Sequence, residues 1–243
     1  LERHYSFEVA TFRRDDIYED GRRPTKIHYS NTQEDVRRRD FTINSLLMDP
    51  ETNEVIDYVG GCKDIEQKLV RTIGDPNRRF SEDYLRMLRA VRFASCLDYQ
   101  IEDKTIQAIK ENAPYIKNIS AERLQEELTK MITRPGGRRG LELLKTTGLL
   151  RHCLPELEKL QGVEQPPRFH PEGDVWRHTL RMLDYLPFDK NKSIHPALAW
   201  ASLLHDTGKA ETRTEDEKGI HFYGHVKRSE EIAENILRRL KFS

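Results

Sequence analysis

The sequence predicts an α+β fold, in which a mixed N-terminal part is followed by mostly helical segments. Apolar and polar side chains alternate in residues 5–13 (YSFEVATFR), and this alternation is typical of a strand. From residue 81 onward, apolar residues recur every three to four positions, as in amphipathic helices. Breaks containing glycine or proline at residues 74–76, 135–137 and 162–173 separate these parts.

The N-terminal part contains several short elements. After the strand at 5–13, the polar residues 14–35 predict a long loop. The pattern then predicts, in order, a short helix at 41–48, a strand at 54–58, a short helix at 64–68 and a strand at 70–73.

The rest of the chain is predicted to be helical. A helix at 81–94 follows the break at 74–76, and Ser120 is expected to cap another helix. A helix at 140–145 ends near Gly148. Residues 162–173 are expected to form a linker or surface loop, and residues 175–242 a last helical region.

Charge is balanced overall but not locally. Of the 243 residues, 34% are charged, and Lys+Arg and Asp+Glu each total 41, so net charge does not favour nucleic acid. Arginines nevertheless cluster at residues 22–23, 37–39, 78–79 and 138–139. Such clusters can bind phosphates on a neutral protein, because screening limits distant charges to a reach of roughly 10 Å.

Cysteine usage and hydropathy point to the cytoplasm. Cys62, Cys96 and Cys153 are scattered without a CxxC pair, which argues against a disulfide framework or a zinc ribbon. No signal peptide and no membrane-spanning run is evident, so we expect a cytoplasmic protein without a membrane partner. The first residue is Leu1, and we expect an N-terminal portion to precede it. The oligomeric state is left open.

The segment at 81–94 (SEDYLRMLRAVRFA) is the most informative. If it is one helix, Asp83, Arg86, Arg89 and Arg92 share a face beside an apolar stripe of Leu85, Leu88 and Val91. Asp83 offers acceptors and Arg86 offers donors, so together they could read the edge of a nucleobase. The alternative is an ordinary ion pair on a solvated helix face.

A second polar cluster lies at residues 38–44 (RRDFTIN). Arg38 and Arg39 can clamp phosphates, and Asn44 can bond a sugar hydroxyl or a phosphate oxygen. The alternative is a basic turn in which Asp40 caps a helix.

Five motifs in a fixed order carry a resemblance to a known family. They are FEVATFR (7–13), YEDGRRP (18–24), RRDFTINSLLMDP (38–50), DPNRRFSEDYLRMLRAVRFA (75–94) and ISAERLQEEL (119–128). From Phe7 onward the chain strongly resembles the class II tRNA nucleotidyltransferases. That family includes the CCA-adding enzymes, their CC- and A-adding relatives, and bacterial poly(A) polymerases.

The resemblance implies a domain order and a metal-dependent chemistry. Residues 1–75 would be part of a polymerase-β-like catalytic domain, and residues 76–160 a helical neck that binds the base and RNA. The family holds two Mg²⁺ ions with an Asp-x-Asp pair and a third carboxylate, to which Glu8 corresponds as the catalytic residue. On its own, Glu8 would be taken for an exposed strand residue. The Asp-x-Asp pair and a Gly-Gly…Arg-Asp turn should precede Glu8, and the sequence has neither, so we expect this chain alone to add no nucleotides.

The resemblance also implies roles in nucleotide binding. Arg39, Asp40 and Asn44 match residues that contact sugar and phosphates, while Asp83 and Arg86 match a protein template for the incoming base. Cytosine and adenine share an amine donor beside a ring-nitrogen acceptor, so one Asp and one Arg can serve both. Arg89 and Arg92 would be phosphate or structural partners.

The C-terminal part contains a candidate metal site. Adjacent His205 and Asp206 in LLHDTGK (203–209), with His178 upstream, suit a divalent transition metal or Mg²⁺, and the alternative is structural hydrogen bonding. His221 and His225 follow. This pattern resembles the HD phosphohydrolase superfamily and implies an HD-type domain at 161–243, expected to be incomplete. Three further histidines, His152, His170 and His195, are expected to have no partners at ligand spacing and to be surface or packing residues.

We therefore expect a template-independent RNA nucleotidyltransferase that adds CMP and AMP from CTP and ATP to tRNA 3′ ends by two-metal phosphoryl transfer. The alternatives are an A-adding enzyme or poly(A) polymerase, an HD phosphohydrolase with an RNA-binding front half, and a non-catalytic tRNA-binding scaffold. Residues 14–35 are expected to influence which nucleotide is added.

Overall fold

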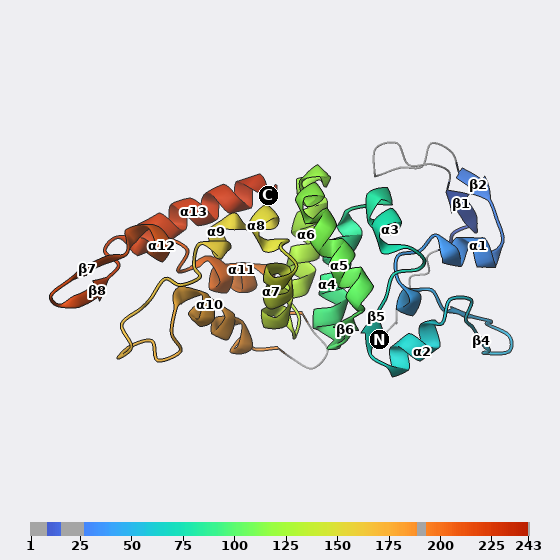
Figure 1. Cartoon of the computed structure of the whole chain (residues 1–243), viewed down its shortest axis with the longest axis horizontal. Coiled ribbons are helices and arrows are strands. Elements are labelled where there is room, and N and C mark those ends of the chain that lie inside the picture. Colours follow the sequence, from blue (N-terminus) through green and yellow to red (C-terminus); the bar gives the residue numbers. More distant parts are fainter. Residues whose placement is uncertain (1–8, 16–26, 189–192, 243) are drawn as a thin grey trace, which may run out of the picture.

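The structure, a computed structural model, describes residues 9–15, 27–188 and 193–242. The molecule is elongated, with the hairpin of β1 (Arg13–Asp15) and β2 (Ile27–Tyr29) at one end and that of β7 (Thr214–Asp216) and β8 (Gly219–His221) at the other (Figure 1). The remaining elements lie between these ends. In chain order they are α1 (Thr32–Arg37), η1 (Thr42–Asn44), β3 (Leu47–Met48), β4 (Val55–Ile56), α2 (Gly61–Glu66), β5 (Leu69–Val70), α3 (Pro76–Glu82), α4 (Leu85–Leu97), β6 (Gln100–Ile101), α5 (Asp103–Asn112), η2 (Ala113–Asn118), α6 (Ala121–Ile132), α7 (Gly137–Thr146), α8 (Leu150–Cys153), α9 (Pro155–Glu158), α10 (Val175–Asp184), α11 (Pro196–Leu204), α12 (Lys209–Thr212) and α13 (His225–Arg239).

The strands are short and pair two by two within the described ranges. Three pairs are antiparallel, namely β1 with β2, β3 with β4, and β7 with β8. The fourth pair, β5 with β6, is parallel and joins the N-terminal part to the segment that follows α4. Helices dominate the rest of the chain, so the predicted α+β class is confirmed at this level.

One buried apolar core runs from Phe41 to Leu240. At its centre α4 packs against both α6 and α7. Leu85, Leu88 and Val91 of α4 are all buried, as the predicted apolar stripe requires. Helix α4 is therefore fixed on one side by the core, and its polar residues lie at the edge of that contact.

The break at residues 135–137 lets α7 approach α4 closely. Gly136 has a positive φ of 97°, and a Cβ at this position would collide with the carbonyl oxygen of Ser95 on α4. Only glycine meets both demands without strain. The predicted break is thus confirmed, and it allows close packing between the two helices.

The predicted helix over 81–94 is two helices. Asp75 caps α3, and its carboxylate accepts a hydrogen bond from the Arg78 amide at 2.8 Å. At Asp83 the backbone becomes extended (φ −157°, ψ 104°), and the Asp83 carboxylate accepts from the Leu85 amide at 3.1 Å. The side chain of Asp83 competes for the backbone and separates α3 from α4. Asp83 therefore does not share a helix face with Arg86.

The prediction for the first 35 residues was only partly right. Residues 1–8 lie outside the described ranges, residues 9–12 are not in a strand, and the first strand begins at Arg13. The segment predicted as a loop at 14–35 contains β2 and most of α1. Asn31 begins α1 by accepting a hydrogen bond from the Glu34 amide at 2.9 Å, a capping signal that the polar composition concealed.

Long-range hydrogen bonds replace the predicted helix at 41–48. The Thr42 amide donates to the carbonyl of Arg71 at 3.0 Å, and the Thr42 hydroxyl donates to Asp64 at 2.5 Å. These bonds allow only the short η1, after which the chain enters β3. Tertiary partners thus override the local preference.

The C-terminal region is helical except for the β7–β8 hairpin, which the sequence pattern did not predict. The region at 162–173 is a loop, as predicted. Helix α6 begins directly after Ser120, but the Ser120 side chain makes no capping hydrogen bond. None of the helices in the described ranges is long and apolar enough to cross a bilayer.

Candidate functional site

A cleft of about 530 Å³ opens between the segment after α1 and the start of α4. It gathers six of the seven residues predicted to bind nucleotide, which are Arg39, Asp40, Asn44, Asp83, Arg86 and Arg89. Four further residues complete its lining, namely Arg38, Leu85, Phe93 and Arg123. The cleft is thus rich in arginine and carries one aromatic ring.

Asp40 is the anchor of the cleft. Its Oδ2 atom accepts a hydrogen bond from Arg89 Nε at 2.6 Å, and its Oδ1 atom accepts from the Phe41 amide at 2.9 Å. The side-chain amide nitrogen Nδ2 of Asn44 lies 3.5 Å from the same Oδ1 atom. Because Asp40 is almost fully buried and committed to these donors, it fixes Arg89 and Asn44 against η1.

Arg39 is held by α1 and η1. It donates to the carboxylate of Asp35 at 3.2 Å and to the carbonyl of Asn44 at 3.2 Å. The two ends of the RRDFTIN segment are thereby tied together. A guanidinium held in this way keeps its charge at the cleft while losing little further side-chain entropy on binding an anion.

Asp83 and Arg86 both line the cleft, but they are not paired with each other. Asp83 Oδ2 pairs with Arg123 Nη2 of α6 at 2.6 Å. Arg86 Nη1 pairs with Glu82 at 2.6 Å, and Arg86 Nη2 donates to the Arg38 carbonyl at 3.3 Å. Each group is therefore held by its own partner. The sequence reading missed Arg123 and Glu82, although both lie within the motifs that it used.

Arg92 does not line the cleft. Its Nε atom pairs with Glu127 Oε2 at 2.6 Å, and both side chains are less than 10% exposed. The Arg92 guanidinium also lies 4.1 Å from the ring centroid of Phe93, which does line the cleft. Of the two roles predicted for Arg92, the geometry favours the structural one.

The described part of the cleft offers no ready Mg²⁺ site. Glu8, predicted as a catalytic carboxylate, lies outside the described ranges. Asp40 and Asp83 are each committed to an arginine. Within the described ranges, two clusters of His, Asp and Glu side chains are close enough together to hold a metal ion, and both clusters lie in the C-terminal region. The described residues of this cleft therefore support nucleotide binding and not the binding of a catalytic metal ion.

The predicted metal residues of the C-terminal region do converge. His178 comes from α10, while His205 and Asp206 follow α11. The two Nε2 atoms are 3.3 Å apart, and they lie 3.6 Å (His178) and 3.2 Å (His205) from Asp206 Oδ2. Ligand atoms about 2.0–2.2 Å from one ion would be separated by roughly 3.0–3.6 Å, so this triangle fits a divalent cation.

Hydrogen bonds orient both imidazole rings. His178 Nδ1 lies 2.7 Å from Glu172 Oε1, and His205 Nδ1 lies 3.0 Å from the Ser202 carbonyl. Because these oxygens accept, each neutral ring carries its proton on Nδ1 and directs the Nε2 lone pair toward Asp206. This arrangement is typical of histidines that bind metals.

Two further residues surround Asp206. Lys209 donates to Asp206 Oδ2 at 2.8 Å and to Gln165 at 2.7 Å. His225 Nε2 lies 3.9 Å from Asp206 Oδ1, and its Nδ1 is bonded to the Phe222 carbonyl at 2.7 Å. His225 therefore directs a third Nε2 atom toward the same carboxylate.

The electrostatics favour an ionised carboxylate here. Burial would raise the pKa of Asp206, but hydrogen bonds from His205, in its protonated form, and from Lys209 outweigh burial and hold the pKa well below its usual range. Burial would also raise the pKa of Glu172, but hydrogen bonds from its own backbone amide, from His178 and from His170 lower that pKa to about 2.

The expectation that His170 has no partner at ligand spacing was wrong. Its Nδ1 atom lies 3.2 Å from Glu172, and its ring packs edge-on against His178 at 5.0 Å. His195 instead caps α11 through the Ala197 amide at 3.2 Å. The sequence pattern also did not predict that Glu172, which lies shortly before α10, would contact His178.

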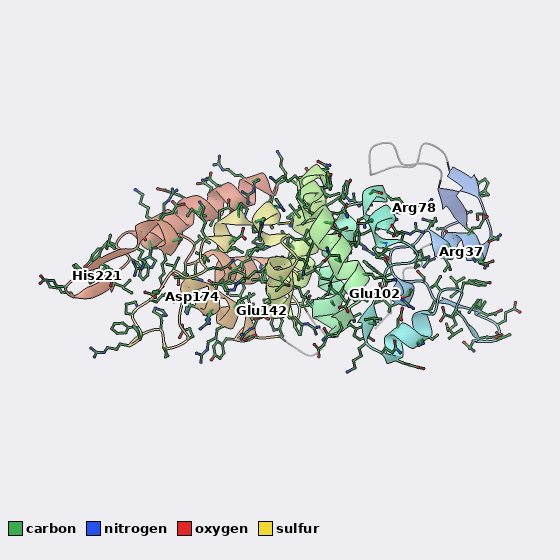
Figure 2. All side chains as sticks on the ribbon, in the orientation of Figure 1. Arg37, Arg78, Glu102, Glu142, Asp174 and His221 are labelled. Carbon is green, nitrogen blue, oxygen red and sulfur yellow. The ribbon has the colours of Figure 1, made fainter. Side chains whose placement is uncertain are left out.

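The two sites lie far apart along the molecule. Figure 2 shows Arg37 and Arg78 in the N-terminal part and His221 close to the opposite end. Arg37 and Arg78 lie near the cleft in sequence, and His221 precedes His225. Each site can therefore be altered without touching the other.

Two regions of the chain match known protein families. Residues 1–71 match a family described as the poly(A) polymerase head domain. Residues 98–160 match one described as the probable RNA- and SrmB-binding site of polymerase A.

Individual relatives extend these matches. A CCA-adding enzyme of Streptococcus sanguinis is 40% identical over 191 residues, which are 76% of this chain and 48% of the relative. Together with the two family matches, this similarity supports the class II tRNA nucleotidyltransferase family for the matched residues. A CCA-adding enzyme of Pediococcus pentosaceus is 47% identical over 148 residues, covering 60% of this chain and 37% of its own length. The chain spans about half the length of such nucleotidyltransferases, or less.

Solved structures agree on the fold. The Bacillus stearothermophilus CCA-adding enzyme in complex with CTP is similar at a TM-score of 0.55 and 25% identity, covering 95% of this chain and 62% of that one. A tRNA-processing enzyme complex is similar at a TM-score of 0.58 and 22% identity, covering 88% and 52%. The arrangement of elements in this chain thus recurs in solved structures of the same fold.

Proposed function

We propose that the cleft binds CTP and ATP for template-independent addition of nucleotides to an RNA 3′ end, in particular that of tRNA. The observation that supports this most directly is the convergence of Arg39, Asp40, Asn44, Asp83, Arg86 and Arg89 on one cleft from segments far apart in sequence. Several guanidinium groups and one ring suit a ligand that combines phosphates with a base.

Asp83 and Arg86 would read the base, each from a fixed position. The carboxylate of Asp83 would accept a hydrogen bond from the exocyclic amine that cytosine and adenine share, and Arg86 would donate a hydrogen bond to the neighbouring ring nitrogen. Guanine and uracil present the opposite order and would leave these groups unpaired. Because Arg123 and Glu82 hold Asp83 and Arg86 before a ligand arrives, little reorganisation is needed.

Titration calorimetry with CTP, ATP, GTP and UTP tests this proposal. We expect CTP and ATP to bind more tightly than the other two, and Arg86→Ala to weaken both by roughly tenfold to a hundredfold, the usual effect of losing a charged hydrogen bond. Arg78→Ala is the matched control, since Arg78 is an exposed arginine of α3 that does not line the cleft. Equal binding of all four nucleotides would overturn the assignment of Asp83 and Arg86.

The described residues suit binding better than transfer. The sequence of this chain contains no Asp-x-Asp pair. Because such a pair would hold the metal ions for transfer, we propose that this polypeptide alone binds nucleotides without adding them. An incorporation assay with labelled ATP and CTP on a tRNA primer, run with Mg²⁺, tests this. Robust incorporation would show that other carboxylates hold the ions.

The C-terminal metal site supports a second candidate function, a metal-dependent phosphohydrolase of the HD type in residues 161–243. The ligand triangle of His178, His205 and Asp206, with both rings oriented by hydrogen bonds, carries this proposal. A divalent ion bound there would act as a Lewis acid and lower the pKa of a bound water for attack on a phosphoester. Glu172 and Ser202 would keep the two imidazoles in the tautomer that binds it.

Equilibrium dialysis with Mn²⁺, Zn²⁺ and Mg²⁺ tests the metal site directly. Asp206→Asn should weaken binding of the preferred ion at least tenfold, while CTP binding in the cleft stays unchanged. His195→Ala, which removes the histidine that caps α11, is the control. If the chain bound none of the three ions, or if Asp206→Asn bound them equally well, the site would be structural.

A further inference from the structure

A second pocket, of about 520 Å³, lies beside the nucleotide cleft in the N-terminal part of the chain. Its polar lining consists of three arginines and two threonines, namely Arg37, Arg71, Arg79, Thr42 and Thr72. Within the described ranges no acidic and no aromatic side chain lines it. The pocket therefore offers a concave surface of one charge, which favours an anionic ligand.

The pocket and the cleft share a wall but no lining residue. Residues 37–44 border both cavities. Of these, Arg37 and Thr42 line the pocket, whereas Asp40 lines the cleft. The Arg79 guanidinium supports this wall by donating a hydrogen bond to the Arg37 carbonyl. Because no described residue lines both cavities, a ligand in the pocket would leave the nucleotide-binding residues of the cleft unoccupied.

Arg71 is held at the pocket with part of its guanidinium available. Its Nε atom donates a hydrogen bond to Asp64 Oδ2 at 2.9 Å, and the Thr42 hydroxyl donates to the same oxygen at 2.5 Å. Asp64 is 1% exposed, so this carboxylate orients the arginine from inside the protein. The two Nη atoms of Arg71 make no hydrogen bond to the described part of the chain. A guanidinium oriented in this way can donate two parallel hydrogen bonds to one phosphate group.

The other two arginines of the pocket differ in what holds them. Arg79 is committed to the fold, because it donates to Glu82 at 2.8 Å and to the Ile73 carbonyl at 2.8 Å. Arg37 is exposed, and no carboxylate of the described ranges pairs with it. Its position at the end of α1 offsets the helix dipole, but that effect does not explain why Arg71, which follows β5, lines the same pocket. Arg37 therefore adds an uncompensated charge to the pocket.

We infer that this pocket binds a small phosphorylated anion, and pyrophosphate is the one that the proposed reaction would release. Arg71 would bind one phosphate group through its Nη atoms, and Arg37 would contact the other. The buried Thr72 hydroxyl, which has no hydrogen-bond partner in the described ranges, is a further donor in the wall. Because no aromatic ring belongs to the described lining, the pocket favours an anion over a nucleotide, whose base would have nothing to stack on. The choice of pyrophosphate rests on the proposed function, since transfer of a nucleotide from CTP or ATP releases this anion.

Titration calorimetry with inorganic pyrophosphate, in the presence of saturating CTP and without divalent cations, tests the pocket. Pyrophosphate should still bind when CTP fills the cleft. Arg37→Gln and Arg71→Lys should each weaken this binding by roughly tenfold to a hundredfold, the usual effect of losing a charged hydrogen bond. Arg71→Lys keeps the charge and can still pair with Asp64, but it removes the planar fork that binds a phosphate group at two points. Arg78→Gln is the matched control, because it removes an equal charge from an arginine of α3 that lines neither cavity.

Several outcomes would overturn the inference, once thermal melting has shown that each variant is folded. They are displacement of pyrophosphate by CTP, unchanged binding by either pocket variant, and an equal loss of binding in Arg78→Gln. CTP binding by Arg37→Gln should be unchanged, and weaker binding would show that the pocket holds the phosphates of the nucleotide instead. CTP binding measured alone separates the two proposals. A chain that binds pyrophosphate through Arg37 but binds no CTP would refute the proposed function and leave the anion pocket standing.

Discussion

Arg92 and Glu127 form a buried ion pair beside the nucleotide cleft, and breaking it should lower stability rather than nucleotide affinity. The atoms Arg92 Nε and Glu127 Oε2 are 2.6 Å apart, with side chains 9% and 5% exposed. Arg92→Ala removes one partner and leaves a carboxylate that water cannot reach. The substitution itself replaces none of the residues that line the cleft.

The structure sets the size of the effect. Removing one member of a buried pair costs about 3–5 kcal/mol in free energy of unfolding. Glu127 keeps Lys130 Nζ at 3.6 Å and Arg89 Nη1 at 4.0 Å, so the loss should lie near the lower end, about 3 kcal/mol. For a chain of this length about 1 kcal/mol shifts the melting temperature by roughly 2–4 °C, so we expect a decrease of about 6–12 °C.

Denaturant unfolding followed by circular dichroism measures this change. A matched variant, Arg92→Met with Glu127→Leu, replaces the pair with apolar side chains of similar volume and should stay within about 1 kcal/mol of the unmodified chain. CTP binding at a temperature where both variants are folded gives the second readout, and we expect it to be nearly unchanged.

The opposite pattern would refute the reasoning. If Arg92→Ala melted like the unmodified chain but bound CTP as poorly as Arg86→Ala, then Arg92 would contact the nucleotide. The other role predicted from the sequence, a phosphate partner, would then be correct.

Three further predictions follow from local geometry. The carboxylate of Asp57 accepts hydrogen bonds from four backbone N–H groups. Burial would raise the pKa of Asp57, but these bonds lower it to about 2. The stability that the ionised carboxylate contributes should therefore be complete above about pH 4 and lost as pH falls toward 2. Acid denaturation of Asp57→Asn should lack that part of the pH dependence, and an identical acid curve would contradict this. Gly136→Ala should lower the free energy of unfolding by more than about 3 kcal/mol, because the added Cβ would collide with the Ser95 carbonyl oxygen. Gly148→Ala, which has open space around it, should cost about 1 kcal/mol. Equal losses in the two variants would argue against that collision. Burial raises the pKa of Cys153 to about 12, so iodoacetamide at pH 8 should label Cys62 and spare Cys153 until the chain unfolds, as peptide mapping would show.

Spacing and motif order were sufficient to identify most of the cleft residues. Arg39, Asp40 and Asn44 lie close together in sequence, so a single turn brings them to one side of the chain. The apolar stripe of α4 was equally legible, because a period of three to four residues predicts one buried face. Local patterns of this kind need no knowledge of the rest of the fold.

Pairing across the chain could not be read from spacing. The regular interval between Asp83 and Arg86 suggested one helix face, but the extended backbone at Asp83 ends α3 there and leaves Asp83 to pair with Arg123 from α6. In the same way Arg92 followed the spacing of Arg89, although it lies against Glu127 and away from the cleft. Residues spaced alike thus acquired different partners because α6 lies against α4.

The metal site shows the same division. His205 and Asp206 were evident because they are adjacent, and His178 because it matched a family pattern. Glu172, His170 and the tautomer of each ring depend on how the loop before α10 folds back toward α11, so no sequence interval reveals them.

The sequence by itself thus determined the helix-rich α+β class, the residue types of both candidate sites and the position of the break at Gly136. Only the tertiary structure decided which carboxylate holds which arginine, that Arg92 supports the cleft without lining it, and that Tyr84 and Tyr115 stack on each other. The physical reason is one of range. Periodicity and capping act within a few residues, whereas ion pairs and ring stacks form between segments brought together only when the core is buried.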